Sequence, residues 1–92
     1  MLEEQRARID AIDAQLVALF EERMNVVEEV IKIKLANQKD ILDTSREKQV
    51  IDKAKGRLKS PKLENEITTF FESLMAISRH YQAKMSEKLK NK

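Results

Sequence analysis

The first 37 residues carry one unbroken apolar helix pattern, and this pattern limits what the chain can fold into. No Gly or Pro occurs between residues 2 and 37. Side chains at a three–four spacing share one face of an α-helix. The stripe with this spacing consists of Ile9, Ile12, Leu16, Leu19, Arg23, Val26, Val30 and Ile33. We therefore expect a single helix from about Leu2 to Asn37, with Arg23 as the odd member of its stripe.

A helix of about 36 residues is too long for the globule that one chain of this length forms. At about 1.5 Å per residue it spans roughly 54 Å. A compact chain of 92 residues has a radius of gyration of about 12 Å and a diameter near ~32 Å. The apolar stripe must be covered along most of its length, and a second copy of the chain is the simplest cover. We expect an intertwined helical homodimer, with a helix that is frayed at its ends as the alternative.

The remaining sequence predicts two further helices and hence an all-α fold. The polar stretch 37–40 indicates a loop, and Asp43 followed by Glu47 is typical of a helix start. Ser60 and Pro61 provide a cap and a first helical residue for the third helix. Its apolar series contains Leu63, Ile67, Phe70, Phe71, Leu74, Tyr81 and Met85, with Ser78 as the odd member.

Length and composition bound the class of protein. The 92 residues predict one domain over 1–92, with a lysine-rich tail from 86 to 92 that we expect to fray. Cysteine is absent, which excludes a disulfide or thiolate-metal framework. The N-terminus is charged from its third residue and no apolar run approaches ~18 residues, so we expect neither a secretory signal nor a membrane span. The expected location is the cytoplasm. A net charge of +2 argues against a general nucleic-acid binder.

Two cations of the first helix lie on its apolar side without an acidic neighbour. None of the residues three or four positions from Arg23 or Lys34 is acidic. Eleven residues separate the two, close to three turns, so both point the same way. A buried cation needs a partner. The local pattern supports a ligand anion and a register-setting Arg in a coiled coil equally. Arg79 also lacks an acidic neighbour.

Other polar residues have plain structural interpretations. Ser78 and Gln82 lie one turn apart near the core side of the third helix, and the local pattern favours inter-helix polar contacts for them. Arg46 is expected to pair with Asp43 at the start of the second helix. His80, off the apolar stripe, is expected to be solvated rather than catalytic.

Taken in order, these residues resemble the all-helical class of chorismate mutases. The resemblance is carried by Arg6, Ile9-Asp10, Ile12-Asp13, Leu16, Arg23, Lys34, the run from Asp43 to Glu47, Ser78 and Gln82, and covers roughly residues 2 to 85. It implies an interlocked dimer of three-helix chains with two equivalent sites. Arg6 lies ~25 Å along the helix from Arg23 and on a different side, so it cannot join Arg23 within one chain. In this family the matching arginine reaches into the partner's site.

The resemblance implies conversion of chorismate to prephenate in phenylalanine and tyrosine biosynthesis. This intramolecular rearrangement needs no nucleophile, metal or redox cofactor. The protein holds the substrate in a compact reactive shape and stabilises charge on the breaking ether oxygen. The resemblance implies that the substrate's carboxylates pair with Arg23 and with the partner's Arg6, and that its ether oxygen accepts hydrogen bonds from Lys34 and Gln82. It also implies that the ring hydroxyl is bound by Glu47 and the backbone near Asp43. Ser78 and Arg46 complete the polar wall of the implied substrate site. Arg6, Arg23, Lys34 and Gln82 are the implied catalytic set.

Some members of this class carry Glu where this chain has Gln82, and an amide, unlike a carboxylic acid, donates at any pH. The link between the second and third helices has no family marker, so Ser78 and Gln82 are aligned by helix pattern alone. Three alternatives stay open: an isochorismate pyruvate lyase of the same fold, a regulatory or binding module without turnover, and a structural helical dimer. The full donor set favours the mutase. Association with a larger enzyme of the pathway is also compatible with the sequence.

Overall fold

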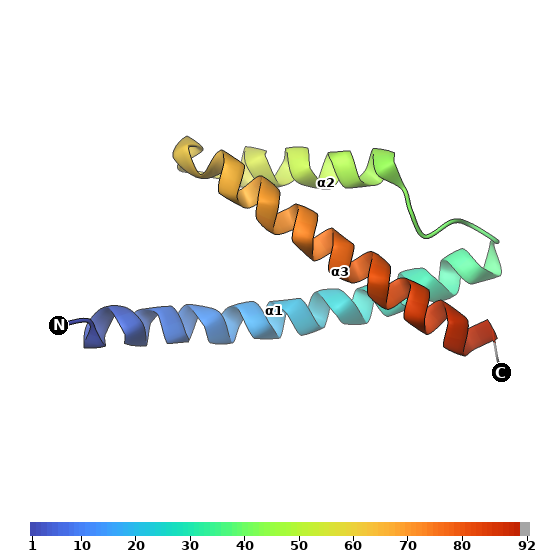
Figure 1. The fold of residues 1–92 in the computed structure, drawn as a ribbon, viewed down its shortest axis with the longest axis horizontal. Coiled ribbons are helices and arrows are strands. Elements are labelled where there is room, and N and C mark those ends of the chain that lie inside the picture. The colour runs from blue at the N-terminus through green and yellow to red at the C-terminus, as the bar shows by residue number, and fades with distance from the viewer. Residues whose placement is uncertain (91–92) are drawn as a thin grey trace.

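The computed structural model describes residues 1–90, which form three α-helices and one short 3-10 turn (Figure 1). Helix α1 spans Glu3–Ala36, α2 spans Thr44–Arg57, the 3-10 turn spans Pro61–Leu63, and α3 spans Glu64–Lys90. No strand occurs in this range. The all-α prediction with a long first helix is confirmed, and α1 begins and ends within one residue of the expected positions.

The ends of α1 and α2 follow from local hydrogen bonding. Asp43 has an extended backbone, and its Oδ1 accepts the backbone N–H of Arg46 at 3.0 Å, which makes it the predicted N-cap. At the end of α1, Gln38 adopts the left-handed conformation with φ 54°. The N–H of Lys39 then donates to the carbonyl of Lys34 at 2.8 Å, a bond that closes the helix and turns the chain away.

The start of α3 differs from the prediction. Ser60 occupies the cap position before Pro61, but its hydroxyl makes no capping hydrogen bond. Instead its carbonyl accepts the N–H of Leu63 at 3.1 Å. This bond spans three residues and tightens the first turn into a 3-10 turn. The α-helix proper therefore begins only at Glu64.

Residues 86–90, the described part of the lysine-rich tail, continue α3 as a helix. Ser86 is buried, and together with Ile31 and Ile41 it lines a small cavity beside the end of α1. Packing against α1 and its following loop thus supports these last turns. Residues 91–92 lie outside the described range.

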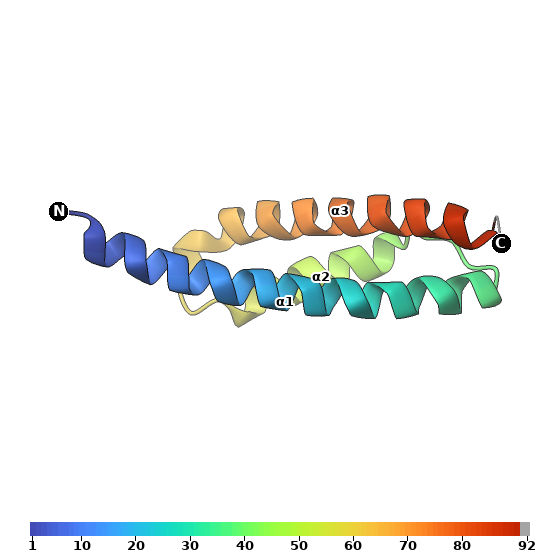
Figure 2. The same ribbon diagram turned by 90° about the horizontal axis from the view of Figure 1, so that it is seen from below.

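Helix α3 packs against both α1 and α2. It runs diagonally from the end of α2 across the second half of α1 (Figure 1), and it lies on one side of both helices in the turned view (Figure 2). The N-terminal half of α1 extends beyond this contact, and every residue from 1 to 22 is exposed. Only three apolar residues of the described range are buried, namely Ile31, Ala54 and Met75. The radius of gyration is 16.3 Å, against about 12 Å for a compact chain of this length.

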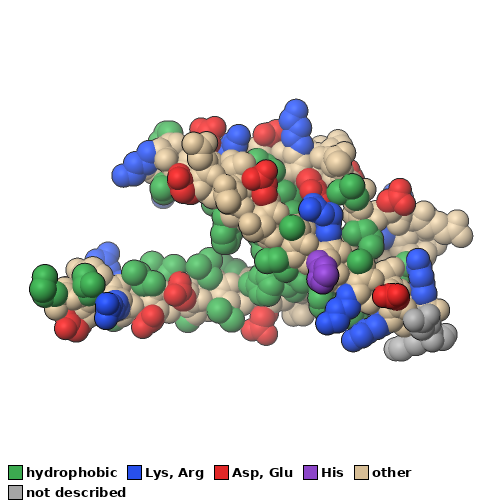
Figure 3. Space-filling model, viewed as in Figure 1, with side chains coloured by type: hydrophobic (Ala, Val, Ile, Leu, Met, Phe, Trp, Pro, Cys, Tyr) green, Lys and Arg blue, Asp and Glu red, His purple; other side chains and the backbone are tan. Residues whose placement is uncertain are grey.

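Among residues 1–90, no helix is both long enough and apolar enough to cross a membrane. Charged side chains are spread along all three helices, including α1, so even the long first helix lacks an extended apolar window (Figure 3).

Candidate functional site

A cavity of about 150 Å³ lies where α1, the start of α2 and the second half of α3 meet. Its apolar wall includes Val27, Val30 and Met75. Its polar lining contains seven of the eight residues that the sequence singled out, namely Arg23, Lys34, Asp43, Arg46, Glu47, Ser78 and Gln82. The fold therefore gathers into one place residues from three separate segments.

Arg23 enters the cavity from α1 and has no acidic hydrogen-bond partner among the described residues. Its Nη1 donates to Oγ of Ser78 at 2.9 Å, and that hydroxyl donates to the carbonyl of Leu74 at 3.0 Å. Ser78 is thus an inter-helix polar contact, as its local pattern favoured. Partial burial lowers the pKa of Arg23, and the nearby positive charge of Arg46 lowers it further. An arginine stays charged at any physiological pH, so this crowded cation favours a bound anion.

Lys34 lies three turns further along α1. Its Nζ donates to the carbonyl oxygen of Ile41, in the loop after the helix, at 2.9 Å. An ammonium group carries three donors, so this bond uses one and leaves two for a ligand. The same contact ties the loop to α1 beside the start of α2.

Asp43 and Arg46 meet in a way that differs from the expected ion pair. The carboxylate of Asp43 accepts the backbone N–H of Arg46 rather than its guanidinium, and the structure shows no salt bridge between the two described side chains. The reason is that an N-cap carboxylate is aimed at the backbone donors of the first helical turn. The exposed guanidinium of Arg46 therefore adds positive charge to the cavity lining.

Arg79 also lines the cavity, and the sequence did not assign it to the site. Its Nη1 donates to both carboxylate oxygens of Glu47, each at 2.5 Å. The signal that could have identified it was the one used for Arg23 and Lys34, the absence of an acidic neighbour in its own helix. The partner lies 32 residues away on α2, which the sequence pattern does not reveal.

Gln82 brings an unused hydrogen-bonding group to the cavity. Its side chain is only 8% exposed, and its Oε1 has no partner among the described residues. Buried polar atoms are nearly always paired, so an orphan that lines a cavity indicates a place for a ligand. A half-turn of the carboxamide exchanges its acceptor for its NH₂ donor with almost no change in shape.

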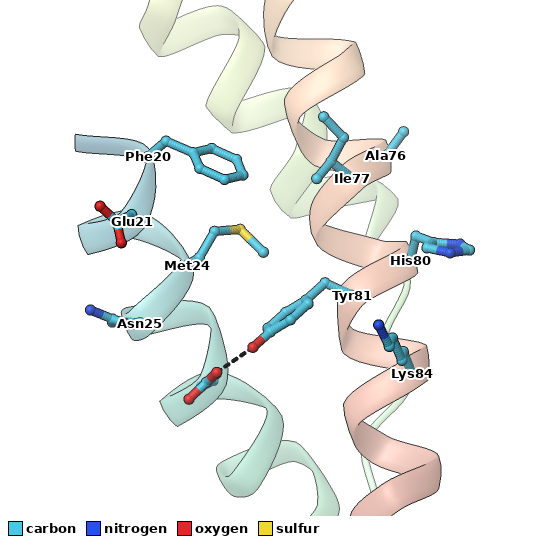
Figure 4. A pocket seen from close by; sticks show the side chains of 10 residues that line it. Phe20, Glu21, Met24, Asn25, Ala76, Ile77, His80, Tyr81 and Lys84 are labelled. Carbon is cyan, nitrogen blue, oxygen red and sulfur yellow. Dashed lines mark hydrogen bonds between the residues drawn. The ribbon is translucent and has the colours of Figure 1, made fainter. Parts of the chain in front are cut away.

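Arg6 stands apart from the other predicted residues. It lies on the exposed N-terminal half of α1 and does not line this cavity. His80 is exposed, as expected, and belongs to a different hollow between α1 and α3 (Figure 4). In that hollow the hydroxyl of Tyr81 donates to the carboxylate of Glu28, which raises the pKa of Tyr81. None of the predicted site residues lines it.

The charges of the cavity define the class of ligand. Its lining holds four cations, Arg23, Lys34, Arg46 and Arg79, and two carboxylates, Asp43 and Glu47, for a net charge of +2. Fold and site together define an all-helical protein with a cation-rich pocket suited to a small dianion.

The model of the chorismate mutase type II family matches residues 5–83, and the chain belongs to this family. No curated protein matches the chain. Membership supports chorismate mutase activity, an isomerase reaction.

Proposed function

We propose that this protein converts chorismate to prephenate in the biosynthesis of phenylalanine and tyrosine, and that it acts in the cytoplasm. The observation that carries the proposal is the single cavity lined by Arg23, Lys34, Glu47 and Gln82. Chorismate presents two carboxylates, a ring hydroxyl and an ether oxygen. The cavity offers cations for the carboxylates, a carboxylate for the ring hydroxyl and hydrogen-bond donors for the ether oxygen. Family membership also supports the activity.

The chemistry requires binding and electrostatics rather than a reacting side chain. In the rearrangement the ether C–O bond breaks while a new C–C bond forms within the same molecule, and no atom is exchanged with the protein. Arg23 pairs with one carboxylate and helps to hold the substrate in its compact reactive shape. Lys34, with two N–H donors beyond its bond to the carbonyl of Ile41, donates to the ether oxygen as negative charge develops there. Gln82, whose Oε1 is unpaired, donates its NH₂ to the same oxygen once the carboxamide is turned over.

Glu47 and the backbone near Asp43 receive the ring hydroxyl in this proposal. A carboxylate is a strong hydrogen-bond acceptor, and Glu47 keeps lone pairs beyond those that Arg79 uses. Ser78, which holds Arg23 at 2.9 Å, and Arg46 complete the polar wall.

The second carboxylate is assigned to the partner's Arg6 in a homodimer. The accessible surface of one chain is 7679 Å², whereas a compact monomer of its mass exposes about 5,500 Å². An excess of about 2,200 Å² on each of two chains reaches the range of obligate dimer interfaces. Side chains of α1 at Ile9, Ile12, Leu16 and Leu19 are 48–60% exposed.

The place for the partner helix is an apolar groove between α1 and α3. The groove measures about 590 Å³, and its lining includes Leu16, Leu19, Phe70 and Phe71. It opens beside the projecting half of α1, where Figure 3 shows hydrophobic side chains along the helix. Arg23 lines both this groove and the cation-rich cavity, so a helix in the groove would lie next to the site.

The direct test is to supply purified protein with chorismate and, separately, with isochorismate, and to identify the products by chromatography. We expect prephenate from chorismate. Removing one donor aimed at developing charge costs about 100- to 1000-fold in kcat, so Lys34→Ala should lose that much, and Arg23→Ala should also fail. Lys48→Ala, on the exposed side of α2 and outside the cavity, is the control and should keep wild-type activity.

Other outcomes would contradict the proposal. Pyruvate and salicylate from isochorismate, with chorismate turned over far more slowly, would make the chain a lyase. No turnover of either compound by a folded dimer would leave a binding or structural module. Equal activity in Lys34→Ala and Lys48→Ala would remove Lys34 from the catalytic set.

A further inference from the structure

The ion pair between Arg79 and Glu47 is the part of the cavity that the roles above do not explain. Arg79 comes from α3 and Glu47 from the first turn of α2, and one guanidinium nitrogen contacts both carboxylate oxygens at 2.5 Å. The two side chains are 37% and 25% exposed, and both line the cavity. Their charges and orientation therefore act directly on what binds there.

Glu47 poses an electrostatic problem for the proposed ligand. It is a carboxylate in a cavity that otherwise gathers cations for a dianion, and like charges close together repel strongly in a partly desolvated site. Arg79 offsets this charge at hydrogen-bond distance. Contact with both oxygens also fixes the plane of the carboxylate, while each oxygen keeps a lone pair for another donor.

A purely structural purpose for the pair is poorly supported. Helices α2 and α3 are already joined outside the cavity by the ion pair of Lys55 with Glu64 at 3.8 Å. The other carboxylate of the cavity, Asp43, is occupied with the backbone of Arg46. Within the described residues, Glu47 is the one acidic partner of Arg79, and both side chains line the cavity.

We propose that Arg79 is a positioning residue of this site, which holds Glu47 as the acceptor for the ligand's hydroxyl and keeps its charge from opposing the ligand's carboxylates. The inference rests on the proposed function, because chorismate is the hydroxyl-bearing dianion in question. Loss of positioning by a group outside the reacting atoms costs up to about 100-fold. We expect Arg79→Met to lower kcat/KM for chorismate by about 10- to 100-fold, mainly through a higher KM, since both effects act on binding.

The experiment compares kcat and KM for chorismate in six proteins, with the melting temperature of each. They are the wild type, Arg79→Met, Arg79→Lys, Glu47→Gln, the double variant of Arg79→Met with Glu47→Gln, and Lys55→Met. Lys55→Met is the matched control, because it also removes an α2–α3 ion pair but lies outside the cavity. It should keep wild-type kcat/KM at a similar melting temperature to Arg79→Met. Arg79→Lys should recover part of the loss because it retains the charge.

The double variant separates positioning from mere packing. Glu47→Gln should lower kcat/KM in the wild-type background and cost nothing further when Arg79 is already absent. The positioning role would be overturned if the losses of kcat/KM in the two single variants multiplied in the double variant, or if Arg79→Met had the same KM as Lys55→Met. In either case, turnover of chorismate by the wild type would still support the proposed function. Absence of wild-type turnover would overturn both. If Arg79→Met does not fold, KM for chorismate is measured in Arg79→Gln instead. A KM equal to that of the wild type in this variant would overturn the inference.

Discussion

Arg23 and Lys34 each donate to a neutral oxygen, the hydroxyl of Ser78 and the carbonyl of Ile41. Neither bond neutralises a charge, so both cations remain available to an anion in the same cavity. The only cavity cation with a carboxylate partner in the described part of the chain is Arg79. Local sequence could show that these three cations lack acidic neighbours, because helix neighbours lie three or four residues apart. It could not show which of them finds a partner on another helix.

The side chain of Gln82 leads to a prediction about how kcat/KM depends on pH. An amide donates a hydrogen bond without titrating, so kcat/KM should stay flat from about pH 5 to 8 as far as this group is concerned. In Gln82→Glu the carboxyl donates only when protonated, and burial raises the pKa of a carboxyl group. Activity of that variant should be highest at low pH and be lost as the pH rises through this pKa.

The measurement is a profile of kcat/KM against pH for both proteins, with circular dichroism at each pH to exclude unfolding. Gln82→Leu, which cannot donate at any pH, serves as the control and should be weak throughout. A wild type that loses turnover between about pH 5 and 8 while folded, or a Gln82→Glu profile parallel to that of the wild type, would contradict the role of Gln82.

At the scale of elements, α2 is the helix whose start builds the site. Asp43 caps it and Glu47 lies in its first turn, so one helix terminus supplies both a structural bond and a carboxylate of the cavity lining. Sequence predicted this start correctly because an N-cap depends on residues within one turn. It misjudged the start of α3, where Ser60 does not cap, since the 3-10 turn after Pro61 satisfies the backbone instead.

Asp43→Ala should lower the free energy of unfolding by about 1 kcal/mol, because the first turn of α2 loses its cap. Asp43→Asn should keep most of the stability, since an asparagine oxygen accepts the same N–H. Urea unfolding of the three proteins, followed by circular dichroism at equal concentrations, measures the difference. Equal losses in the two variants would mean that the charge of Asp43, and not its capping bond, provides the stability.

At the scale of the whole molecule, one chain does not cover its own apolar surface. The N-terminal half of α1 projects from the rest of the chain (Figure 1), and its apolar side chains are exposed. The apolar groove lined by Phe70 and Phe71 is also uncovered in a single chain. The proposed homodimer buries both and brings the partner's Arg6 to a site that otherwise lacks it. This assignment predicts that two inactive variants, each lacking a different cation of the site, complement each other in a mixed dimer.

Arg6→Ala and Arg23→Ala should each be inactive alone, because every site of either homodimer lacks one cation. When the two chains are unfolded together and refolded in equal amounts, half of the dimers are mixed, and one of the two sites in a mixed dimer is intact. Activity should therefore return to about one quarter of the wild-type value. The control mixture, Arg23→Ala with Lys34→Ala, should stay inactive, because both residues come from the same chain.

Sedimentation of the wild-type protein completes this test and should give twice the mass of one chain. A monomer, or a refolded mixture with no recovered activity, would remove Arg6 from the site. Recovery in the control mixture would instead show that the cations of one site come from both chains in a different arrangement.

The sequence by itself determined the three helices, the cap at Asp43, the loop after α1 and the set of cations that lack local partners. These features depend on interactions within about four residues, which a linear pattern displays directly. Only the tertiary structure decided that seven predicted residues line one cavity, that Arg79 is bound to Glu47, that Gln82 keeps an unpaired oxygen and that residues 86–90 stay helical. Those outcomes depend on which helix faces meet, and residues more than 30 positions apart make the contacts.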